Sequence, residues 1–223
     1  SIIENFKKIE EKNFKDKRKK NMKYLKTNKK KVKGKKTMLD TSPRVIMVQN
    51  VGLFSIGSSL SASKIAGDLT ETNARVISSV EETTKYKFIT EKDLFDVEYW
   101  SLEQAKIKKT KKILQGNVVV ITGGFGAIGS ATYKLFKSFG AEIVLLDFDA
   151  KKVKEMQTKI TDLCLYCDVR NKNSIRNAFK RISVRYGGID ILISNAGTAI
   201  GGSIAEVDDK ILRKSFEDNF FSH

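Results

Sequence analysis

The stretch that most constrains the fold is NVVVITGGFGAIG, residues 117–129. Its four consecutive apolar β-branched residues, 118–121, predict a buried strand, and the glycines after them predict a tight turn into a helix. A strand that enters a helix through such a turn directs backbone N–H groups, at the positive end of the helix dipole, toward one place. That arrangement can hold a pyrophosphate. Because glycine-rich turns also occur elsewhere, the interpretation depends on the residues C-terminal to the turn.

Strand and helix patterns alternate after this turn. Further apolar strands are predicted within residues 140–149, 163–167 and 187–197, and helices at about 127–139, 150–160 and 172–186, with a last helix from near Val207. Repeated units with apolar strands predict an α/β fold. We expect a Rossmann-type doubly wound parallel sheet, incomplete, with about four strands present and helices on both faces.

Asp147 ends the second of these strands, 18 residues after Gly129. A carboxylate at this place can accept hydrogen bonds from both hydroxyls of an adenosine ribose and would repel a 2′-phosphate. The pattern therefore favours NAD over NADP. The alternative is a solvated aspartate at a strand end.

Polar and small residues also end the third and fourth strands. Asp168 can accept a hydrogen bond from an adenine amino group, or it can cap the helix that begins after Asn171. Asn195, Ala196 and Gly197 end the fourth strand, and their small size allows close approach of the backbone to a cofactor. The carboxyl ends of parallel strands are where open sheets bind ligands. Several such signals in this order are more specific than any one of them.

The segments TGGFGAIG, LLDFD, CDV and NAG resemble the successive signatures of the short-chain dehydrogenase/reductase family. The sequence departs from the commonest family pattern at Ala127, where glycine is usual. The resemblance implies a Rossmann fold, a nicotinamide cofactor, and hydride transfer to or from a carbonyl or an alcohol. It implies that the turn holds the pyrophosphate, that Asp147 binds the ribose and that Asp168 and Val169 meet the adenine. The cofactor-binding residues implied are Gly123, Gly124, Phe125, Gly126, Ala127, Ile128, Gly129, Asp147, Asp168, Val169, Asn195, Ala196 and Gly197.

Asn219, in SFEDNFFSH, matches the helix asparagine of the family's active-site tetrad, where it anchors a water in a proton relay. The alternative is a polar residue on an exposed helix face. The other residues of the family's tetrad are a Ser and a Tyr-x-x-x-Lys pair. In the family they lie beyond the asparagine, and they have no counterpart between Asn219 and His223. Tyr133 and Lys137 have that spacing, but they lie on the helix after the glycine turn, so we do not expect them to be catalytic.

The segments PRVIMVQNVGLFSIG and EKDLFDVEYWSLEQAKI resemble the part that joins the two halves of bifunctional rhamnulose-1-phosphate aldolase/alcohol dehydrogenase-like proteins. We therefore expect a Lys-rich segment at 1–36, the end of a class II aldolase-like domain with a linker at 37–112, and a truncated NAD-binding domain at 113–223. The resemblance implies a parent that splits a phosphorylated ketose and whose dehydrogenase half acts on a small hydroxy-aldehyde or sugar-derived alcohol.

We expect the chain to be an internal fragment of that parent, inactive alone, with a homo-oligomer formed by the full-length protein. The aldolase half implies a histidine-bound zinc, but His223 is the only histidine, so no metal site is expected here. Two alternatives remain: a stand-alone sugar-alcohol dehydrogenase of the same family, and a non-catalytic nucleotide- or nucleic-acid-binding module.

Local patterns between residues 37 and 112 predict a strand near 44–49, a turn over 51–59 and a helix over about 61–82. A further helix is predicted over 93–107, with Thr90 to Asp93 as its capping arrangement.

The net charge of +16 is concentrated at the N-terminus, where residues 1–36 contain sixteen Lys and Arg against four Asp and Glu. This segment can form a patch for nucleic acid or an anionic surface, or a solvated surface. Lysine outnumbers arginine 34 to 8 in the chain, which favours the solvated surface, and a nucleic-acid partner is not expected.

No apolar run reaches the length of a membrane span and no signal-peptide pattern is present, so we expect a cytoplasmic protein without a membrane partner.

Cys164 and Cys167 are three positions apart on a predicted strand. They should point to opposite faces of the sheet, which favours ordinary packing over a redox or metal motif.

Overall fold

The computed structural model describes residue 19 and residues 37–39, 42–107, 112–199, 201–203 and 205–222. The chain divides into two compact units, residues 1–111 and 112–223. Apart from Lys19, the Lys-rich segment predicted at 1–36 lies outside the described residues, as does His223. Among the helices that are described, none combines the length and the apolar character needed to cross a membrane.

The first unit contains an antiparallel hairpin. Strand β1, Val45–Val48, pairs with β2, Gly52–Ser55, and Val48 lies opposite Gly52. The strand expected near 44–49 is confirmed, but the prediction of a turn over 51–59 is wrong for β2. The turn is confined to the three residues before Gly52, because Asn50 adopts a positive φ of 60° there and reverses the chain at once.

Helix α2, Leu60–Glu81, comes after the hairpin and confirms the helix predicted at about 61–82. Its N-cap is Ser59, whose hydroxyl accepts a hydrogen bond from the N–H of Ala62 at 3.1 Å. Such a cap satisfies one of the N–H groups that have no partner inside a helix.

The single helix predicted at 93–107 is two helices, α3 (Glu91–Glu98) and α4 (Ser101–Lys106). Thr90 caps α3 as predicted, through a hydrogen bond from the Asp93 N–H at 3.2 Å. The break falls at Tyr99, which is buried and whose hydroxyl accepts a hydrogen bond from the N–H of Leu39 at 3.3 Å. This contact with a distant segment fixes Tyr99 at a place where periodicity alone would continue the helix.

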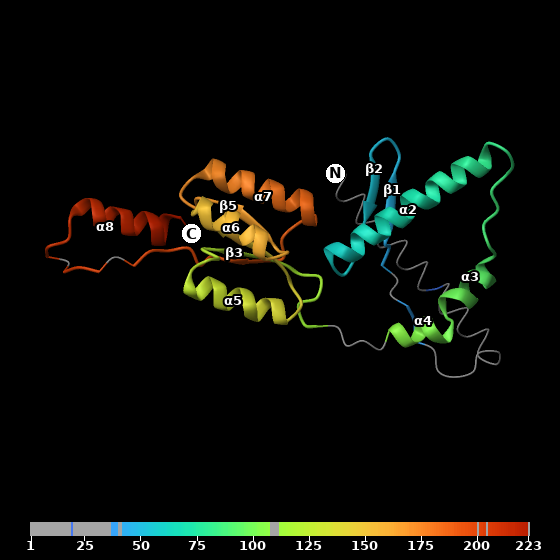
Figure 1. Ribbon diagram of the computed structural model, residues 1–223, viewed down its shortest axis with the longest axis horizontal. Coiled ribbons are helices and arrows are strands. Elements are labelled where there is room, and N and C mark those ends of the chain that lie inside the picture. The colour runs from blue at the N-terminus through green and yellow to red at the C-terminus, as the bar shows by residue number, and fades with distance from the viewer. Residues whose placement is uncertain are drawn as a thin grey trace. The chain divides into compact units, whose positions relative to one another are not determined.

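The second unit is built around a parallel four-stranded sheet in the order β5-β4-β3-β6, which confirms the predicted Rossmann-type α/β fold. The strands are β3 (Val118–Thr122), β4 (Glu142–Asp147), β5 (Leu163–Tyr166) and β6 (Ile191–Ile193). The helices between them are α5 (Ala127–Ser138), α6 (Ala150–Lys159) and α7 (Lys172–Tyr186). Figure 1 shows α5 and α7 on opposite sides of the sheet.

Alternate side chains of the strands enter two separate cores. Val118 and Val120 face α7, where they join Ala178 and Ile182, whereas Val119 packs with α5 and α6 on the other face. Cys167 belongs to the first core and Cys164 to the second, as predicted from their spacing. Burial raises the pKa of both thiols, that of Cys164 to about 11, so neither is an activated nucleophile.

The last helix, α8, spans Asp209–Phe216 and continues into a π-helical turn, η1, Glu217–Phe221. This confirms the helix expected from near Val207. A π turn inserts an extra residue into the helical ladder and often occurs at functional sites. Here it carries Asp218 and Asn219.

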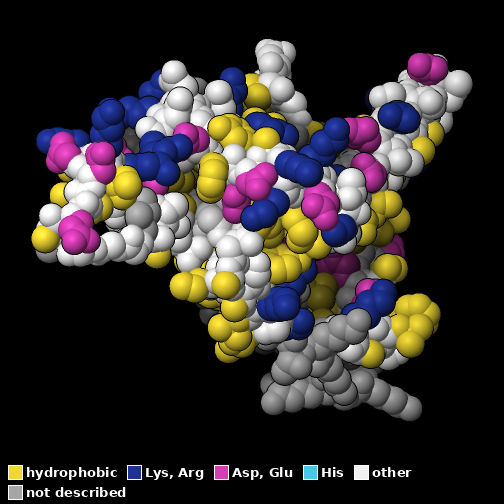
Figure 2. Space-filling view, turned by 60° about the vertical axis from the view of Figure 1, so that its left-hand side comes forward, with side chains coloured by type: hydrophobic (Ala, Val, Ile, Leu, Met, Phe, Trp, Pro, Cys, Tyr) yellow, Lys and Arg dark blue, Asp and Glu magenta, His cyan; other side chains and the backbone are white. Residues whose placement is uncertain are grey.

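On the face shown in Figure 2, lysine and arginine side chains are interspersed with aspartate and glutamate, and hydrophobic side chains lie between them. Mixed charge of this kind is typical of a solvated protein surface.

Candidate functional site

A cavity of about 440 Å³ lies at the carboxyl ends of the four parallel strands. Open parallel sheets bind ligands at this edge. The structure brings together here twelve of the thirteen residues that the sequence assigns to a cofactor. They are Gly123, Phe125, Gly126, Ala127, Ile128, Gly129, Asp147, Asp168, Val169, Asn195, Ala196 and Gly197.

The glycines of the turn allow close packing of backbone against backbone. Gly123 has a φ of 62°, and a Cβ there would lie 2.9 Å from the Cα of Ala196. A Cβ on Gly129 would overlap the carbonyl oxygen of Gly123. Gly124 is the one assigned residue that does not line the cavity, because its N–H donates to the Leu146 carbonyl at 3.0 Å and it packs against β4.

The N-terminus of α5 opens into this cavity without a side-chain cap. Its N-cap residue is Gly126, which has no side chain to accept from the first N–H groups. Helices α6 and α7, in contrast, are capped by Asp149 and Asn171. The first turn of α5 lines the cavity, so its N–H groups and the helix dipole are available to an anion there.

Asp147 is a buried carboxylate held by two backbone groups. Its Oδ2 accepts from the N–H of Phe125 and its Oδ1 from the N–H of Asp149, both at 3.1 Å. These bonds fix the carboxylate between the glycine turn and the start of α6. Each oxygen has two lone pairs, so each can accept one further hydrogen bond from a ligand hydroxyl.

Asn195 ties the end of β6 to the glycine turn. Its side-chain amide donates to the carbonyls of Thr122 at 3.0 Å and Gly123 at 3.2 Å. The Thr122 hydroxyl in turn accepts from the backbone N–H groups of Asn195 and Ala196, at 2.9 and 3.0 Å. Asn195 therefore shapes the cavity by holding the turn in place.

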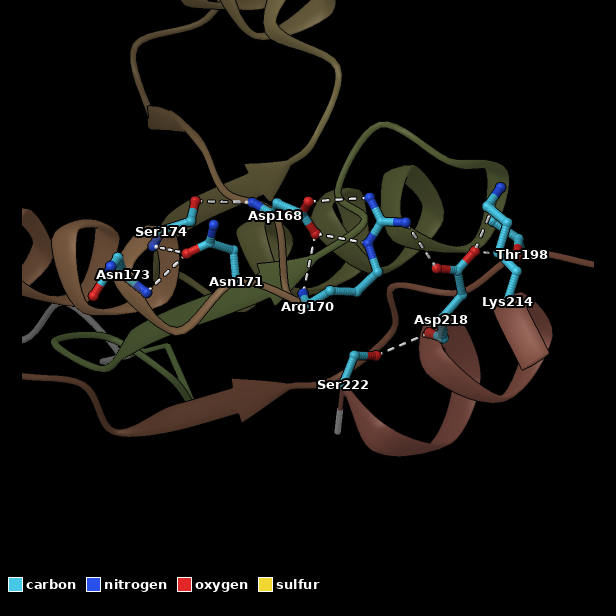
Figure 3. A network of polar contacts seen from close by, with 9 residues as sticks. All are labelled: Asp168, Arg170, Asn171, Asn173, Ser174, Thr198, Lys214, Asp218 and Ser222. Carbon is cyan, nitrogen blue, oxygen red and sulfur yellow. Dashed lines mark hydrogen bonds and ion pairs between the residues drawn. The ribbon is translucent and has the colours of Figure 1, made fainter. Parts of the chain in front are cut away.

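The alternative role predicted for Asp168, as the cap of the helix after Asn171, is wrong, because Asn171 itself caps α7. The Asp168 carboxylate instead pairs with Arg170 in a two-point contact, Nε to Oδ1 at 2.9 Å and Nη2 to Oδ2 at 3.0 Å (Figure 3). The Arg170 guanidinium lowers the pKa of Asp168 below its ordinary value, chiefly through these hydrogen bonds.

Asn219 lies beside the cavity and does not line it. Its Oδ1 accepts from the Thr198 N–H at 2.9 Å and its Nδ2 donates to the Thr198 carbonyl at 2.8 Å. The side chain thus pairs with both backbone groups of one residue, and it holds the loop after β6 against η1.

Eight residues of the cavity wall were not predicted from the sequence. They are Phe148, Asp149, Lys152, Cys167, Arg170, Thr198, Lys214 and Asp218. Their only sequence signal was proximity to residues already assigned. Asp218 precedes Asn219, and Arg170 lies two positions after Asp168.

Tyr133 and Lys137 lie on α5 and contact Asp162, which is buried. The Tyr133 hydroxyl donates to Asp162 Oδ2 at 2.9 Å, and Lys137 Nζ lies 2.6 Å from Asp162 Oδ1. Burial, and then the hydrogen bond to Asp162, raises the pKa of Tyr133 to about 12. Tyr133 therefore stays protonated and serves packing between α5 and the start of β5, away from the cavity lining.

Among the described residues, no group of three or more His, Cys, Asp or Glu side chains is arranged to hold a metal ion.

Comparison with known families agrees with this geometry. Residues 117–223 match the family model described as short chain dehydrogenase. Residues 117–223 therefore form a domain of the short-chain dehydrogenase type. Residues 2–107 match the model described as aldolase class II, second domain, so an aldolase-type domain precedes the dehydrogenase domain, as the resemblance predicted. Members of the dehydrogenase family are oxidoreductases that typically bind NAD or NADP.

Curated relatives include an uncharacterized oxidoreductase, YuxG, of Bacillus subtilis (strain 168), 29% identical over 182 residues that cover 78% of this chain and 26% of the relative. Short chain aldehyde dehydrogenase 1 of Euphorbia lathyris is 35% identical over 118 residues, 50% of this chain and 41% of the relative. The chain thus spans less than half the length of these relatives.

Among solved structures, a short-chain dehydrogenase/reductase described as glucose/ribitol dehydrogenase from Brucella melitensis aligns with a TM-score of 0.47 and 25% identity, over 51% of this chain and 49% of that one.

Proposed function

We propose that the dehydrogenase domain binds NAD in the cavity at the carboxyl ends of its strands. The observation that carries this proposal is the pairing of two features in one cavity: the uncapped N-terminus of α5 and the fixed carboxylate of Asp147. The first suits a pyrophosphate and the second suits the two hydroxyls of a ribose. Bound NAD would supply the hydride chemistry, and the protein would bind and orient it.

The preference for NAD over NADP follows from the charge and rigidity of Asp147. A 2′-phosphate at the ribose would meet a carboxylate that two backbone hydrogen bonds prevent from turning away. Lys152 lines the same cavity, but its Nζ lies 3.8 Å from Asp149 Oδ2, so part of its charge is already balanced. The repulsion by Asp147 should therefore exceed the attraction by Lys152.

We also propose that the parent protein is a bifunctional aldolase/dehydrogenase acting on a small hydroxy-aldehyde or a sugar-derived alcohol. The order of the two matched domains supports this over a stand-alone dehydrogenase. Asn219 would belong to its catalytic centre, and the parent would form a homo-oligomer. The substrate class rests on the resemblance alone.

The proposal is tested by titrating the chain with NADH and following the emission of the nicotinamide. We expect saturable binding. Asp147→Ala should raise the Kd for NADH by roughly 10- to 100-fold, because the variant loses the charge-assisted hydrogen bonds to the ribose. Binding of NADPH should be spared or improved in the same variant, because the repelling charge is gone.

Asp96→Ala, which removes an exposed carboxylate from α3 in the other unit, is the matched control and should leave both affinities unchanged. No binding at millimolar NADH would refute the proposed function. Equal losses for NADH and NADPH would refute the role of Asp147 at the ribose.

A further inference from the structure

Four charged side chains line one wall of the cavity: Asp168, Arg170, Lys214 and Asp218 (Figure 3). Asp218 is the most buried of them, with 8% of its surface exposed. It comes from the π-helical turn η1, while Asp168 and Arg170 come from the loop after β5. The wall therefore joins segments that are 48 residues apart in the sequence.

Arg170 bridges these two segments with its guanidinium group. Its Nε and Nη2 bind Asp168, and its Nη1 lies 3.2 Å from Asp218 Oδ1. A planar guanidinium presents its donors in a fixed fork, so one arginine can hold two carboxylates at a set separation. A lysine ammonium in the same position keeps the charge and lacks the fork.

The second oxygen of Asp218 continues the contact toward the loop after β6. Asp218 Oδ2 accepts from the Thr198 hydroxyl at 2.9 Å, and the Lys214 Nζ lies 3.9 Å away. Thr198 is thus held by its hydroxyl through Asp218 and by its backbone through Asn219. The place of Asn219 relative to the cavity depends on how η1 is fixed, and Arg170 fixes η1 through Asp218.

We propose that Arg170 and Asp218 are positioning residues. Their ion pair, which we call the clasp, attaches η1 to the loop after β5. It thereby holds Asn219 and the cavity-lining residues Gly197 and Thr198 in place for the dinucleotide. The ligand in this proposal rests on the proposed function, whereas the clasp itself is a property of the chain without ligand. Loss of either partner should release η1 and loosen the hold on Thr198.

Charge alone predicts a different pattern. An anionic dinucleotide would be bound less tightly after loss of a positive charge in Arg170→Gln and more tightly after loss of a negative charge in Asp218→Asn. The clasp predicts weaker binding in both variants, because each change removes the same ion pair. It also predicts that the double variant is no worse than the poorer single variant.

Two measurements on the full chain test the proposal. The first is amide hydrogen exchange in the absence of ligand, read at Thr198, whose N–H donates to Asn219, and at the central strand β3 as a reference for global folding. In Arg170→Gln and Asp218→Asn we expect exchange at Thr198 to be roughly 10-fold faster, with β3 unchanged. Arg170→Lys, which keeps the charge without the fork, should also lose protection at Thr198.

The second measurement is the Kd for NADH, which should rise by roughly 10-fold in both single variants. Arg176→Gln, which removes an exposed arginine from α7, is the control for charge and should change neither readout. Unchanged exchange at Thr198 in both single variants would overturn the clasp, as would full protection in Arg170→Lys. Opposite shifts of the Kd in the two single variants would assign the effect to charge.

Absence of NADH binding to the unsubstituted chain would refute the proposed function alone, because exchange at Thr198 would still decide the clasp. If Arg170→Gln or Asp218→Asn loses protection at β3 as well, that variant is globally destabilised. Exchange at Thr198 in Arg170→Lys then decides whether the clasp exists.

Discussion

Replacement of Gly129 by alanine tests whether the glycine turn is fixed by close backbone packing. The added Cβ would overlap the carbonyl oxygen of Gly123 and lie 2.9 Å from the Cα of Gly124. Both obstacles are backbone atoms of the turn, so no side chain can rotate to make room. Relief requires the start of α5 to move away from the turn.

Two effects of opposite sign decide the outcome. Alanine is a better helix former than glycine and would add at most about 1 kcal/mol to stability. Overpacking against a rigid neighbour costs about 1–3 kcal/mol, and the upper part of that range applies because the obstacle is backbone. We therefore expect Gly129→Ala to lower the free energy of unfolding of the second unit by about 1–2 kcal/mol.

The assay is amide hydrogen exchange at β3, whose residues are buried and report opening of this unit. The only tryptophan, Trp100, lies in the other unit, so its fluorescence is no substitute. A loss of about 1–2 kcal/mol corresponds to exchange roughly 5- to 30-fold faster. NADH binding should weaken as well, because the N–H groups of α5 move with the helix.

Gly188→Ala is the control, since a Cβ at Gly188 meets nothing within 4 Å, and its effect should stay within about 0.5 kcal/mol. Exchange at β3 that is unchanged or slower in Gly129→Ala would refute the packing argument.

Three further outcomes are expected. Tyr133→Phe should cost about 1 kcal/mol of stability through the lost hydrogen bond to Asp162 and leave the Kd for NADH unchanged; a large loss of binding would show that this pair serves the cofactor. Both cysteines should resist a thiol reagent at about pH 8 in the folded chain, since burial raises the pKa of each thiol, and should react after unfolding in urea. Rapid reaction of the folded chain would contradict this expectation. Because Arg170 lowers the pKa of Asp168, the pair contributes stability above the ordinary aspartate pKa of about 3.9, and this contribution is lost as the pH falls through the lower pKa of the folded state. The stability difference between the unsubstituted chain and Arg170→Gln, measured by urea unfolding, should therefore be present at about pH 6 and shrink in acid; a difference that grows in acid would contradict the sign.

The strands and helices of the second unit were predictable because their signals are local. The apolar run at 118–121, the turn glycines and the helix caps act within a few residues of one another, so their order along the chain carries the information. The errors in predicted helices and strands lay in the first unit. Gly52–Ser55 forms a strand because of pairing with β1, and Tyr99 interrupts a helix because of a contact with Leu39. Both depend on partners that periodicity does not identify.

The order of residues alone predicts a glycine turn that leads into a helix, with a carboxylate at the end of the next strand. These features depend only on residue type and short spacing. The hydrogen-bond partners of the polar groups around the cavity, in contrast, depend on how the chain folds. Asp168 pairs with Arg170, Arg170 reaches Asp218, and Asn219 holds the backbone of Thr198. The last two contacts join segments 48 and 21 residues apart, and the sheet topology and the π-helical turn fix their geometry. Spacing along the chain therefore does not reveal them.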